Sequence, residues 1–264
     1  RNWLHETARR VSSSFGYQEY DAPILESLNL YIAKSGEELV KENFAFPDRS
    51  GDMITLRPEL TPSLARMVAQ RQKQLVFPLR WWSFGPFWRY ERPQKGRTRE
   101  FFQWNIDLMG ADSPLADAEL ISIGAIFLDS VGLTPNEVKI FVNNRKLLDQ
   151  EFNQINISNE LRPIVFKLID KRDKMTFSEW EAYAHEIGLA QSTFNQLVDL
   201  LSNLELWKKS EDLCSLFSYV DSMGLSQWVS YAPHIIRGLD YYTGPVFDAW
   251  DSDAEFRAIL GGGR

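Results

Sequence analysis

The sequence contains very little cysteine and histidine: one cysteine, Cys214, and three histidines, His5, His185 and His234, among 264 residues. A single cysteine excludes an intrachain disulfide framework and fits a reducing compartment, so we expect a cytoplasmic protein. The histidines lie far apart and no Cys/His cluster has the spacing of zinc ligands, so we expect no dedicated metal site. No apolar run approaches the length of a membrane span, so we expect no membrane partner.

An excess of positive charge is also missing. The chain has 36 acidic and 29 basic side chains, a formal charge of −7. This balance argues against a dedicated nucleic-acid-binding domain, although it leaves room for local basic patches. The sequence starts with Arg1 rather than Met, in the middle of an amphipathic pattern, so we expect that further residues precede it.

Proline and glycine are scarce in one long stretch of the chain. Residues 164–232 contain no proline, and their only glycines are Gly188 and Gly224. Within this stretch Thr176 and Glu179 have the spacing of a helix-capping box. The stretch is therefore predicted to be helical.

These patterns predict an α+β fold with an insertion. We expect a mainly antiparallel sheet flanked by helices, interrupted by an all-helical insertion domain at residues 146–229. The core would then consist of residues 1–145 and 230–264. In this core we expect helices at 2–15, 61–72 and 115–131, strands at 17–26, 137–143 and within 234–250, and a hairpin that joins 44–47 to 53–56.

Two details of these elements carry further expectations. Pro23 cannot donate to a strand ladder, so the strand around it is expected at a sheet edge or an interface. Thr61 is expected to cap the helix that Pro62 opens.

A second hairpin gives the clearest sign of a ligand site. Residues 81–91 are rich in aromatics and residues 102–109 alternate in polarity, with a basic loop between them. In the second strand one face carries Phe102, Trp104, Ile106 and Leu108, and the other carries Phe101, Gln103, Asn105 and Asp107. We expect the first face to pack on helices and the second to line a polar site.

The loop of this hairpin has the composition of a polyphosphate site. The basic residues Arg92, Lys95, Arg97 and Arg99 surround Gly96. A guanidinium group can make two parallel hydrogen bonds to the oxygens of one phosphate. A solvated loop with surface charges is the competing interpretation.

Arg89 and Glu91 lie within the aromatic strand itself. A buried charge there is costly unless it is paired or bound to a ligand. A purely structural Arg–Glu pair remains the alternative to a ligand site.

Several segments resemble the class II aminoacyl-tRNA synthetases, in the form found in the histidyl-tRNA synthetase family. Residues 87–103 resemble motif 2 of that class, and residues 55–61 resemble the segment that holds the amino acid's α-amino group. Residues 237–244 (Arg-Gly-Leu-Asp-Tyr-Tyr-Thr-Gly) resemble the signature of histidyl enzymes. The first helix and the strand with Pro23 resemble motif 1, which forms dimers in the family.

The resemblance implies ATP-dependent activation of histidine, followed by transfer to tRNA(His). The catalytic residues would be Arg89 and Arg237, both on the α-phosphate of ATP. The implied ATP contacts are Arg89, Glu91, Arg97 and Arg237, with Mg²⁺ bound to the ATP phosphates rather than to a protein site.

The resemblance also implies a pocket for L-histidine. The α-amino group would contact Glu59, Thr61 and Gln103. The imidazole ring would lie between Asp107 and Tyr242, with Tyr241 beside it. The glycines of residues 261–263 resemble the strand that floors this pocket.

Three further expectations concern partners. A homodimer would form through the first helix and the Pro23 strand, with Tyr20, Ile24 and Leu25 in the contact. The helical insertion would bind tRNA through phosphate contacts from Lys167, Lys171, Arg172, Lys174, Lys208 and Lys209. The sequence ends at Arg264, before the motif 3 and anticodon-binding domain that the family carries, and we therefore interpret it as part of a longer protein.

Two non-catalytic functions remain open at this point. The first is a synthetase paralogue that regulates a phosphoribosyltransferase of histidine biosynthesis. The second is a sensor of uncharged tRNA. The presence of Glu59, Arg89, Gln103, Arg237 and the Tyr241–Tyr242 pair favours the enzyme.

Overall fold

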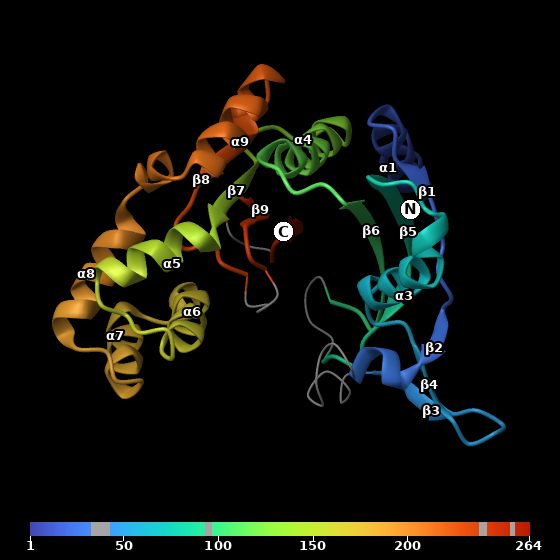
Figure 1. Ribbon diagram of the computed structural model, residues 1–264, viewed down its shortest axis with the longest axis horizontal. Helices are drawn as coiled ribbons and strands as arrows, with labels where there is room; N and C mark the ends of the chain where they lie inside the picture. The colour runs from blue at the N-terminus through green and yellow to red at the C-terminus, as the bar shows by residue number, and fades with distance from the viewer. Residues whose placement is uncertain (33–42, 93–96, 238–241, 254–256) are drawn as a thin grey trace. The chain divides into compact units, whose positions relative to one another are not determined.

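A computed structural model of the chain describes residues 1–32, 43–92, 97–237, 242–253 and 257–264 (Figure 1). The chain divides into two compact units, Arg1–Ala111 and Asp112–Arg264. Both contain helices and mainly antiparallel sheets, which confirms the predicted α+β class. The predicted domain boundaries at 145/146 and 229/230 stay predictions.

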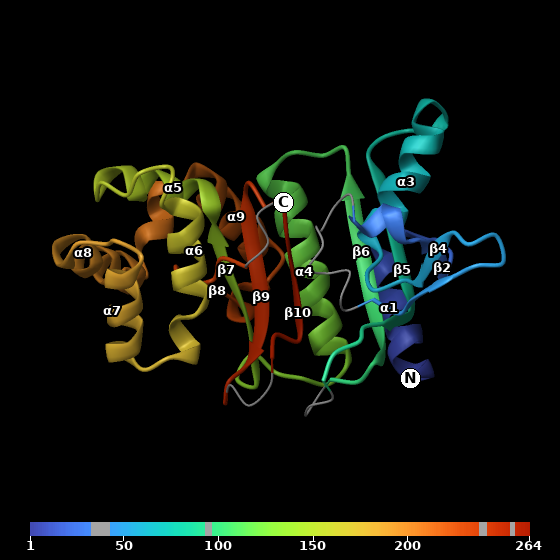
Figure 2. The ribbon, with the colours of Figure 1, turned by 90° about the horizontal axis from the view of Figure 1, so that it is seen from below.

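The first unit contains a three-stranded sheet, built around the predicted second hairpin, and a helix that packs on it (Figure 2). The helix is α1 (Asn2–Ser14), and the strands run in the order β1 (Gln18–Glu19), β5 (Leu79–Trp88) and β6 (Glu100–Met109). β5 pairs antiparallel with β6, and β1 pairs parallel with β5.

α1 covers one face of this sheet. Trp104 donates from its indole Nε1 to the Ser12 hydroxyl at 3.2 Å, and the His5 ring stacks on Phe84 with centroids 5.1 Å apart. The face with Trp104 therefore packs on a helix, as the alternation of the sequence predicted. The face with Gln103 and Asp107 points the other way.

The predicted strand around Pro23 is wrong as a single element. The chain forms β1, then leaves strand geometry, and pairs again as β2 (Leu25–Ser27) with β4 (Met53–Leu56) in a different sheet. Pro23 lies in the break between the two strands. No strand hydrogen bond is needed there, so the lack of a backbone N–H at proline has no cost. One strand pattern thus contains two short strands that belong to two sheets.

The predicted first hairpin is confirmed. β3 (Ala45–Pro47) pairs antiparallel with β4. The Asp48 carboxylate accepts hydrogen bonds from the backbone N–H groups of Ser50 and Asp52, at 2.8 and 3.0 Å. This side-chain closure of the turn is what the polar sequence between the strands predicts.

The helix after this hairpin, α3, spans Thr61–Arg71 and continues as a short 3-10 turn, η1 (Gln72–Gln74). Pro62 lies in its first turn as predicted, but Leu60, not Thr61, is the N-cap. Thr61 is therefore already helical, and its exposed side chain does not cap the helix.

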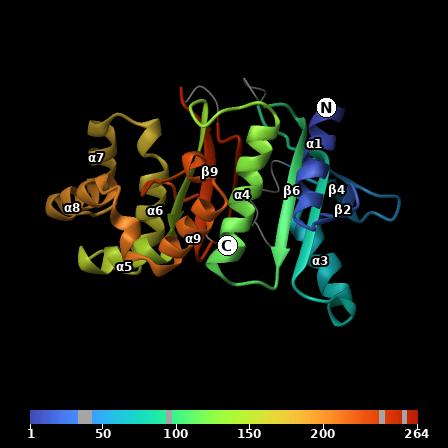
Figure 3. The same ribbon diagram turned by 90° about the horizontal axis from the view of Figure 1, so that it is seen from above.

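The second unit is built on a four-stranded sheet. Its strands run in the order β10 (Leu260–Gly263), β9 (Pro245–Asp251), β7 (Val138–Asn144) and β8 (Val229–Tyr231). Two helices, α4 (Pro114–Ser130) and α9 (Glu211–Ser222), lie side by side (Figure 3). β8 falls in the stretch predicted to be helical, because three residues are too few to show a strand pattern.

The rest of this stretch is helical. Besides α9, the helical elements of this unit after β7 are α5 (Arg145–Gln154), α6 (Arg162–Asp170), η2 (Arg172–Lys174), α7 (Phe177–Glu186), α8 (Gln191–Ser202), η3 (Leu206–Lys209) and η4 (Ser226–Trp228). The predicted capping box of α7 is confirmed, with bonds in both directions between Thr176 and Glu179. One continuous core joins these helices to α4 and β7, with members such as Ile121, Ile140 and Phe152 all fully buried.

Candidate functional site

The face of β5 and β6 that α1 leaves uncovered carries most of the predicted site residues of the first unit. The strand register places Gln103 opposite Gly85, and Asp107 opposite Trp81. Asn105 lies between the two polar positions on the same face. The structure therefore brings Gln103 and Asp107 onto one surface, as the alternation predicted.

Asp107 is the most perturbed acid on this surface. Its side chain is half-buried, and burial raises the pKa of Asp107 to about 6. The carboxyl group is still mostly ionised at neutral pH. It can therefore accept hydrogen bonds from a ligand that carries an N–H group.

Arg57 lies across this same face. Its side chain is 2% exposed, and it donates from Nε to the Pro86 carbonyl at 3.0 Å and from Nη1 to the Ala22 carbonyl at 2.8 Å. Its guanidinium carbon lies 4.8 Å from the centre of the Phe87 ring. The buried cation thus ties β5 to the segment after β1. Sequence reasoning missed it, although an unexplained glycine inside a strand, Gly85, is a signal of close approach.

The segment after Arg57 carries Glu59 and Thr61 and is tied to the end of β5. The Trp88 N–H donates to the Arg57 carbonyl at 3.1 Å, and Arg89 Nε donates to the Pro58 carbonyl at 3.0 Å. Glu59, half-buried, therefore lies in a segment held beside Arg89. Thr61 follows at the start of α3 with its side chain exposed.

Arg89, Glu91 and Arg97 form a charged group at the hairpin tip. Arg89 Nη1 lies 3.8 Å from the Glu91 carboxylate, and Arg97 Nη1 contacts the other oxygen of that carboxylate. Glu91 is 14% exposed, against 32% and 35% for the two arginine side chains. The structural pair considered from the sequence is present. However, the two positive groups keep contact with solvent and give the tip a net positive charge.

Part of the predicted basic loop, residues 93–96 with Lys95, lies outside the described residues. Of the flanking arginines, Arg99 places its guanidinium carbon 4.2 Å from the Tyr90 ring centre. This stacking orients Arg99 along the strand end.

The second unit holds Arg237 against a strand of glycines. Arg237 Nη1 lies 2.5 Å from the Asp248 carboxylate and 3.4 Å from the Phe247 carbonyl. Burial raises the pKa of Asp248 to about 6, and the Arg237 charge opposes that rise. Arg237 also has φ of +46°, a strained conformation for an arginine, which indicates that its position is fixed by its surroundings.

The glycines of β10 make room for these side chains. A Cβ atom at Gly261 would overlap the Arg237 guanidinium and the Asp248 carboxylate. A Cβ atom at Gly263 would lie 2.8 Å from the Tyr242 ring, and that ring centre is 5.7 Å from the Arg237 guanidinium carbon. The strand thus lies directly against the Arg237 and Tyr242 side chains, and its role as the floor of a histidine pocket stays a prediction.

Tyr241 and the rest of its signature, residues 238–240, lie outside the described residues. Asp248 was not predicted as a site residue, because its contact with Arg237 joins the middle of β9 to a residue outside the strands, and no local sequence pattern indicates such a pair.

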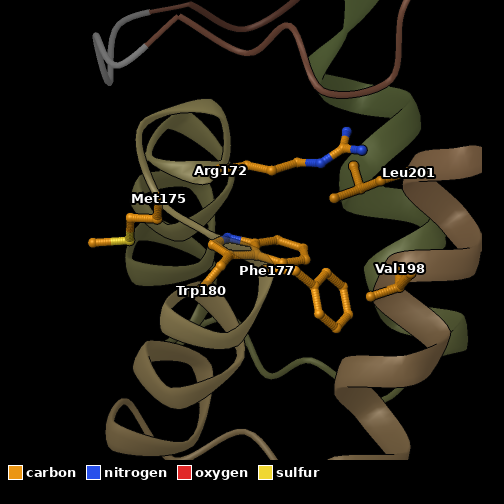
Figure 4. Close-up of a pocket in the computed structure, with 6 residues that line it drawn as sticks. All are labelled: Arg172, Met175, Phe177, Trp180, Val198 and Leu201. Carbon is orange, nitrogen blue, oxygen red and sulfur yellow. The ribbon is translucent and has the colours of Figure 1, made fainter.

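The helical part of the second unit contains a cavity of about 320 Å³, lined by Arg172, Met175, Phe177, Trp180, Val198 and Leu201. Figure 4 shows Arg172 extended above the two aromatic side chains. None of the predicted catalytic or histidine-binding residues lines this cavity.

Comparison with known proteins gives consistent matches over the whole chain. A family model described as histidyl-tRNA synthetase matches residues 1–264. A chloroplastic/mitochondrial histidine–tRNA ligase of Arabidopsis thaliana is 39% identical, over 100% of this chain and 56% of its own length. Histidine–tRNA ligases of Thermoplasma volcanium and Haloarcula marismortui are 38% and 35% identical, over 63% and 64% of their lengths.

Two solved structures share the fold. A Bacillus halodurans protein described as an ATP phosphoribosyltransferase regulatory subunit/histidyl-tRNA synthetase has a TM-score of 0.83 and 20% identity, and covers 99% of this chain and 70% of its own. A histidyl-tRNA synthetase from Nostoc sp. PCC 7120 has a TM-score of 0.80 and 24% identity, and covers 94% of this chain and 60% of its own. The chain spans less than two thirds of the length of the curated relatives it matches.

Proposed function

Because the chain belongs to the histidyl-tRNA synthetase family, we propose that its protein activates L-histidine with ATP and transfers the histidyl group to tRNA(His). The observation that carries the proposal is the set of fixed cations at the two places where the family signatures fall. Arg89 is held by the Pro58 carbonyl and Arg237 by Asp248, and both hydrogen bonds orient the guanidinium groups before any ligand arrives.

In the proposed first step an oxygen of the histidine carboxylate attacks the α-phosphorus of ATP. The bond to the bridging oxygen breaks, and pyrophosphate leaves with that electron pair, so negative charge builds on the phosphate oxygens. Arg89 and Arg237 are the residues proposed to stabilise this charge. Arg97, paired with Glu91 at the hairpin tip, is proposed to contact the terminal phosphates. Such preoriented cations typically contribute about 10²–10³ each to the rate.

The proposed histidine pocket uses the face of β6 that α1 leaves uncovered. Glu59, Thr61 and Gln103 would bind the α-amino group. The ring would contact Asp107, Tyr241 and Tyr242. An ionised Asp107 supports this assignment, because a carboxylate accepts a hydrogen bond from the N–H of an imidazole and forms none with an apolar ring.

Mg²⁺ is proposed only as a companion of the ATP phosphates. Among the described residues no group of three or more His, Cys, Asp or Glu side chains has a metal-binding arrangement. The carboxylates beside the predicted phosphate contacts are already paired: Glu91 faces Arg89 and Arg97, and Asp248 faces Arg237. This donor set does not fit a dedicated magnesium site, so no step is assigned to one.

The proposed macromolecular partners are tRNA(His) and a second copy of the chain. The helical segment would supply the tRNA contacts, although Lys209 is already bound to the Glu151 carboxylate at 2.9 Å. The homodimer would use α1 and the segment after it, where Ile24 and Leu25 are 44% and 47% exposed. Tyr20, the third residue expected in that contact, has its ring 5.4 Å from the Trp81 ring. We propose a cytoplasmic location. No helix in the described part of the chain is long and apolar enough to cross a membrane.

A regulatory subunit remains the second candidate, since the Bacillus halodurans structure carries that description beside the synthetase name. Histidine-dependent exchange of pyrophosphate into ATP separates the two functions. The synthetase proposal predicts exchange with histidine, no exchange with phenylalanine, and a loss of about 10²–10³ in Arg89→Ala. Arg49→Ala, in the exposed turn between β3 and β4, is the control and should behave as wild type. Absence of exchange in the wild-type protein would leave the regulatory function.

A further inference from the structure

The cavity in the helical part of the second unit has walls of two kinds. Five of the six described residues that line it are apolar, namely Met175, Phe177, Trp180, Val198 and Leu201. The sixth is Arg172, which extends above the aromatic side chains (Figure 4). A ligand in this cavity would therefore meet apolar surface on most sides and a single positive charge.

The charge of Arg172 has no carboxylate partner within the described part of the chain. The neighbouring cations make other contacts. Lys174 Nζ lies 3.1 Å from the Asp170 carboxylate, and Lys171 Nζ lies 4.6 Å from the centre of the Tyr183 ring. Since no other described lining residue is charged, an anionic group in the cavity would pair with the Arg172 guanidinium.

The aromatic walls are held in place and offer no free polar atom. The indole N–H of Trp180 is already used, because it donates to the Leu168 carbonyl at 2.8 Å. The Phe194 ring lies 5.0 Å from the Trp180 ring and 5.9 Å from the Phe177 ring. Phe177 nevertheless remains 60% exposed. A ligand that covers this ring would gain free energy from the burial of apolar surface and would make no hydrogen bond with it.

The size of the cavity limits the ligand to a small molecule. Its volume of about 320 Å³ lies at the lower end of the range of small-molecule sites. It corresponds to about ten non-hydrogen atoms, if each takes about the 30 Å³ of a water molecule in the liquid. One guanidinium group matches one carboxylate, to which it can make two parallel hydrogen bonds. A nucleotide has a polar base and a more highly charged phosphate, and the described walls offer no second polar side chain for them.

We propose that this cavity binds a small carboxylic acid with one apolar ring. The carboxylate pairs with Arg172, and the ring packs against Phe177 and Trp180. This site lies outside the proposed synthetase chemistry, because the cavity is lined by none of the residues assigned to histidine or ATP. It also gives Arg172 a different ligand from the tRNA phosphate that the sequence predicted.

The test is a titration of the full protein, followed by ligand-observed NMR, with 3-phenylpropanoate and with its neutral counterpart, 3-phenylpropanamide. Wild-type protein should prefer the acid by about 10-fold, because hydrogen bonds between ionised groups are about twice as strong as neutral ones. Arg172→Gln should weaken binding of the acid by about 10-fold and leave the amide within about 2-fold. Lys174→Gln is the matched control, because it removes a positive charge from the same turn, η2, but not from the cavity lining. Neither affinity should change in this control.

A second variant tests the location of the ligand. Val198→Trp places a large ring in the cavity and should abolish binding of both the acid and the amide. Unchanged binding in this variant, or a preference for the acid that survives in Arg172→Gln, would overturn the proposal.

Competition experiments need no substitution and cover the case in which a variant does not fold. Saturating L-histidine or ATP should not displace 3-phenylpropanoate from the wild-type protein, and displacement by either would place the acid in the proposed synthetase site and overturn the inference. Tighter competing binding by AMP would indicate a nucleotide site instead. Tighter competing binding by acetyl-Gly-Gly-Phe would indicate a site for the end of a peptide chain. A wild-type protein that does not bind the acid would also overturn the proposal.

Discussion

The guanidinium group of Arg57 lies directly over Gly85, so close that a Cβ atom at that glycine would overlap Arg57 Nη2. Arg57 is almost fully buried and is held by the carbonyl groups of Ala22 and Pro86. The absence of a side chain at Gly85 is therefore what allows a cation to cross the sheet. The Arg57 side chain thereby links β5, through the Pro86 carbonyl, to the segment after β1, through the Ala22 carbonyl.

Gly85→Ala should destabilise the first unit by about 1–3 kcal/mol, because the displaced guanidinium would no longer make its buried hydrogen bonds. Urea unfolding followed by tryptophan fluorescence measures the change. Gly124→Ala is the control: its Cβ would make ordinary contacts with Leu260 at 3.5 Å, inside helix α4. Alanine there should be neutral or slightly stabilising. Equal destabilisation by both substitutions would contradict this account of Gly85.

Gly261→Ala should reduce histidine-dependent pyrophosphate exchange by about 10²-fold, because the added methyl group displaces the Arg237 guanidinium. Gly262→Ala is the informative neighbour. Its Cβ would lie on the opposite face, 2.7 Å from the Phe247 ring, and away from Arg237. It should lower the unfolding midpoint more than it lowers the exchange rate of the folded protein. The prediction fails if the two variants lose activity equally at matched folded fractions.

Asp107→Asn should stabilise the protein at pH 8 and lose that advantage as the pH falls towards 4. The pKa of Asp107 is about 6 in the folded chain, above its ordinary value of 3.8, so the folded state binds its proton more tightly. Stability from this group therefore decreases as pH rises from about 4 to about 6 and is constant above. The gain at pH 8 should be roughly 1–3 kcal/mol, measured by urea unfolding across the pH range. A gain independent of pH would rule out Asp107 as the cause.

Removal of lysines from the helical segment should weaken tRNA binding in a salt-sensitive way. Lys167, Lys171 and Lys174 are exposed, and their joint replacement by alanine should lower the salt slope of tRNA(His) binding by roughly 0.7–0.9 for each phosphate that is no longer neutralised. Pyrophosphate exchange should not change. Lys73→Ala, on the exposed η1 turn, is the control for charge alone. An unchanged salt slope in the triple variant would show that this segment does not bind tRNA.

Lys209 is unsuitable for that experiment, because its replacement would leave Glu151, 8% exposed, without its bound ammonium group. Deletion of the whole segment is equally uninformative. The segment shares one continuous core with α4 and β7, and its removal would expose that core.

Leu25→Asp should shift a homodimer towards monomer. Leu25 is 47% exposed on β2, and an aspartate there would place two like charges close together in a symmetric contact. Sedimentation velocity at micromolar concentration measures the shift. Met53→Asp, also exposed but on β4, tests whether the contact extends across this sheet. A wild-type protein that sediments as a monomer would contradict the homodimer.

The sequence predicted the β5–β6 hairpin well because strand alternation is a local property. Each of Gln103, Asn105 and Asp107 is two residues from the next, so their common face follows without knowledge of the fold. Three helix ends were also predictable, since Gly16, Gly132 and the Thr176 capping box act within one turn, whereas the expected cap at Thr61 was wrong. These features depend on neighbours in the chain.

The errors arose where the answer depended on distant residues. The sequence does not show which face of the sheet Tyr20 occupies, and only the pairing of β1 with β5 places its ring beside Trp81. The Arg237–Asp248 pair joins a residue outside the strands to the middle of β9, beside Gly261 of β10, and no local pattern indicates this contact. Pro23 marked a real irregularity, but its sequence could not show that the chain changes sheets there.

The brevity of β1 makes the composition of the ligand face depend on chain length. β1 pairs through only two residues, and three residues, Phe15–Tyr17, connect it to α1. Addition or loss of one residue in this connection would exchange Glu19 and Tyr20 between the two faces. The carboxylate that now contacts His5 and Arg9 would then replace a hydroxyl group beside Asp107. Chimeras that graft another N-terminal helix onto this sheet must therefore keep three residues between that helix and β1.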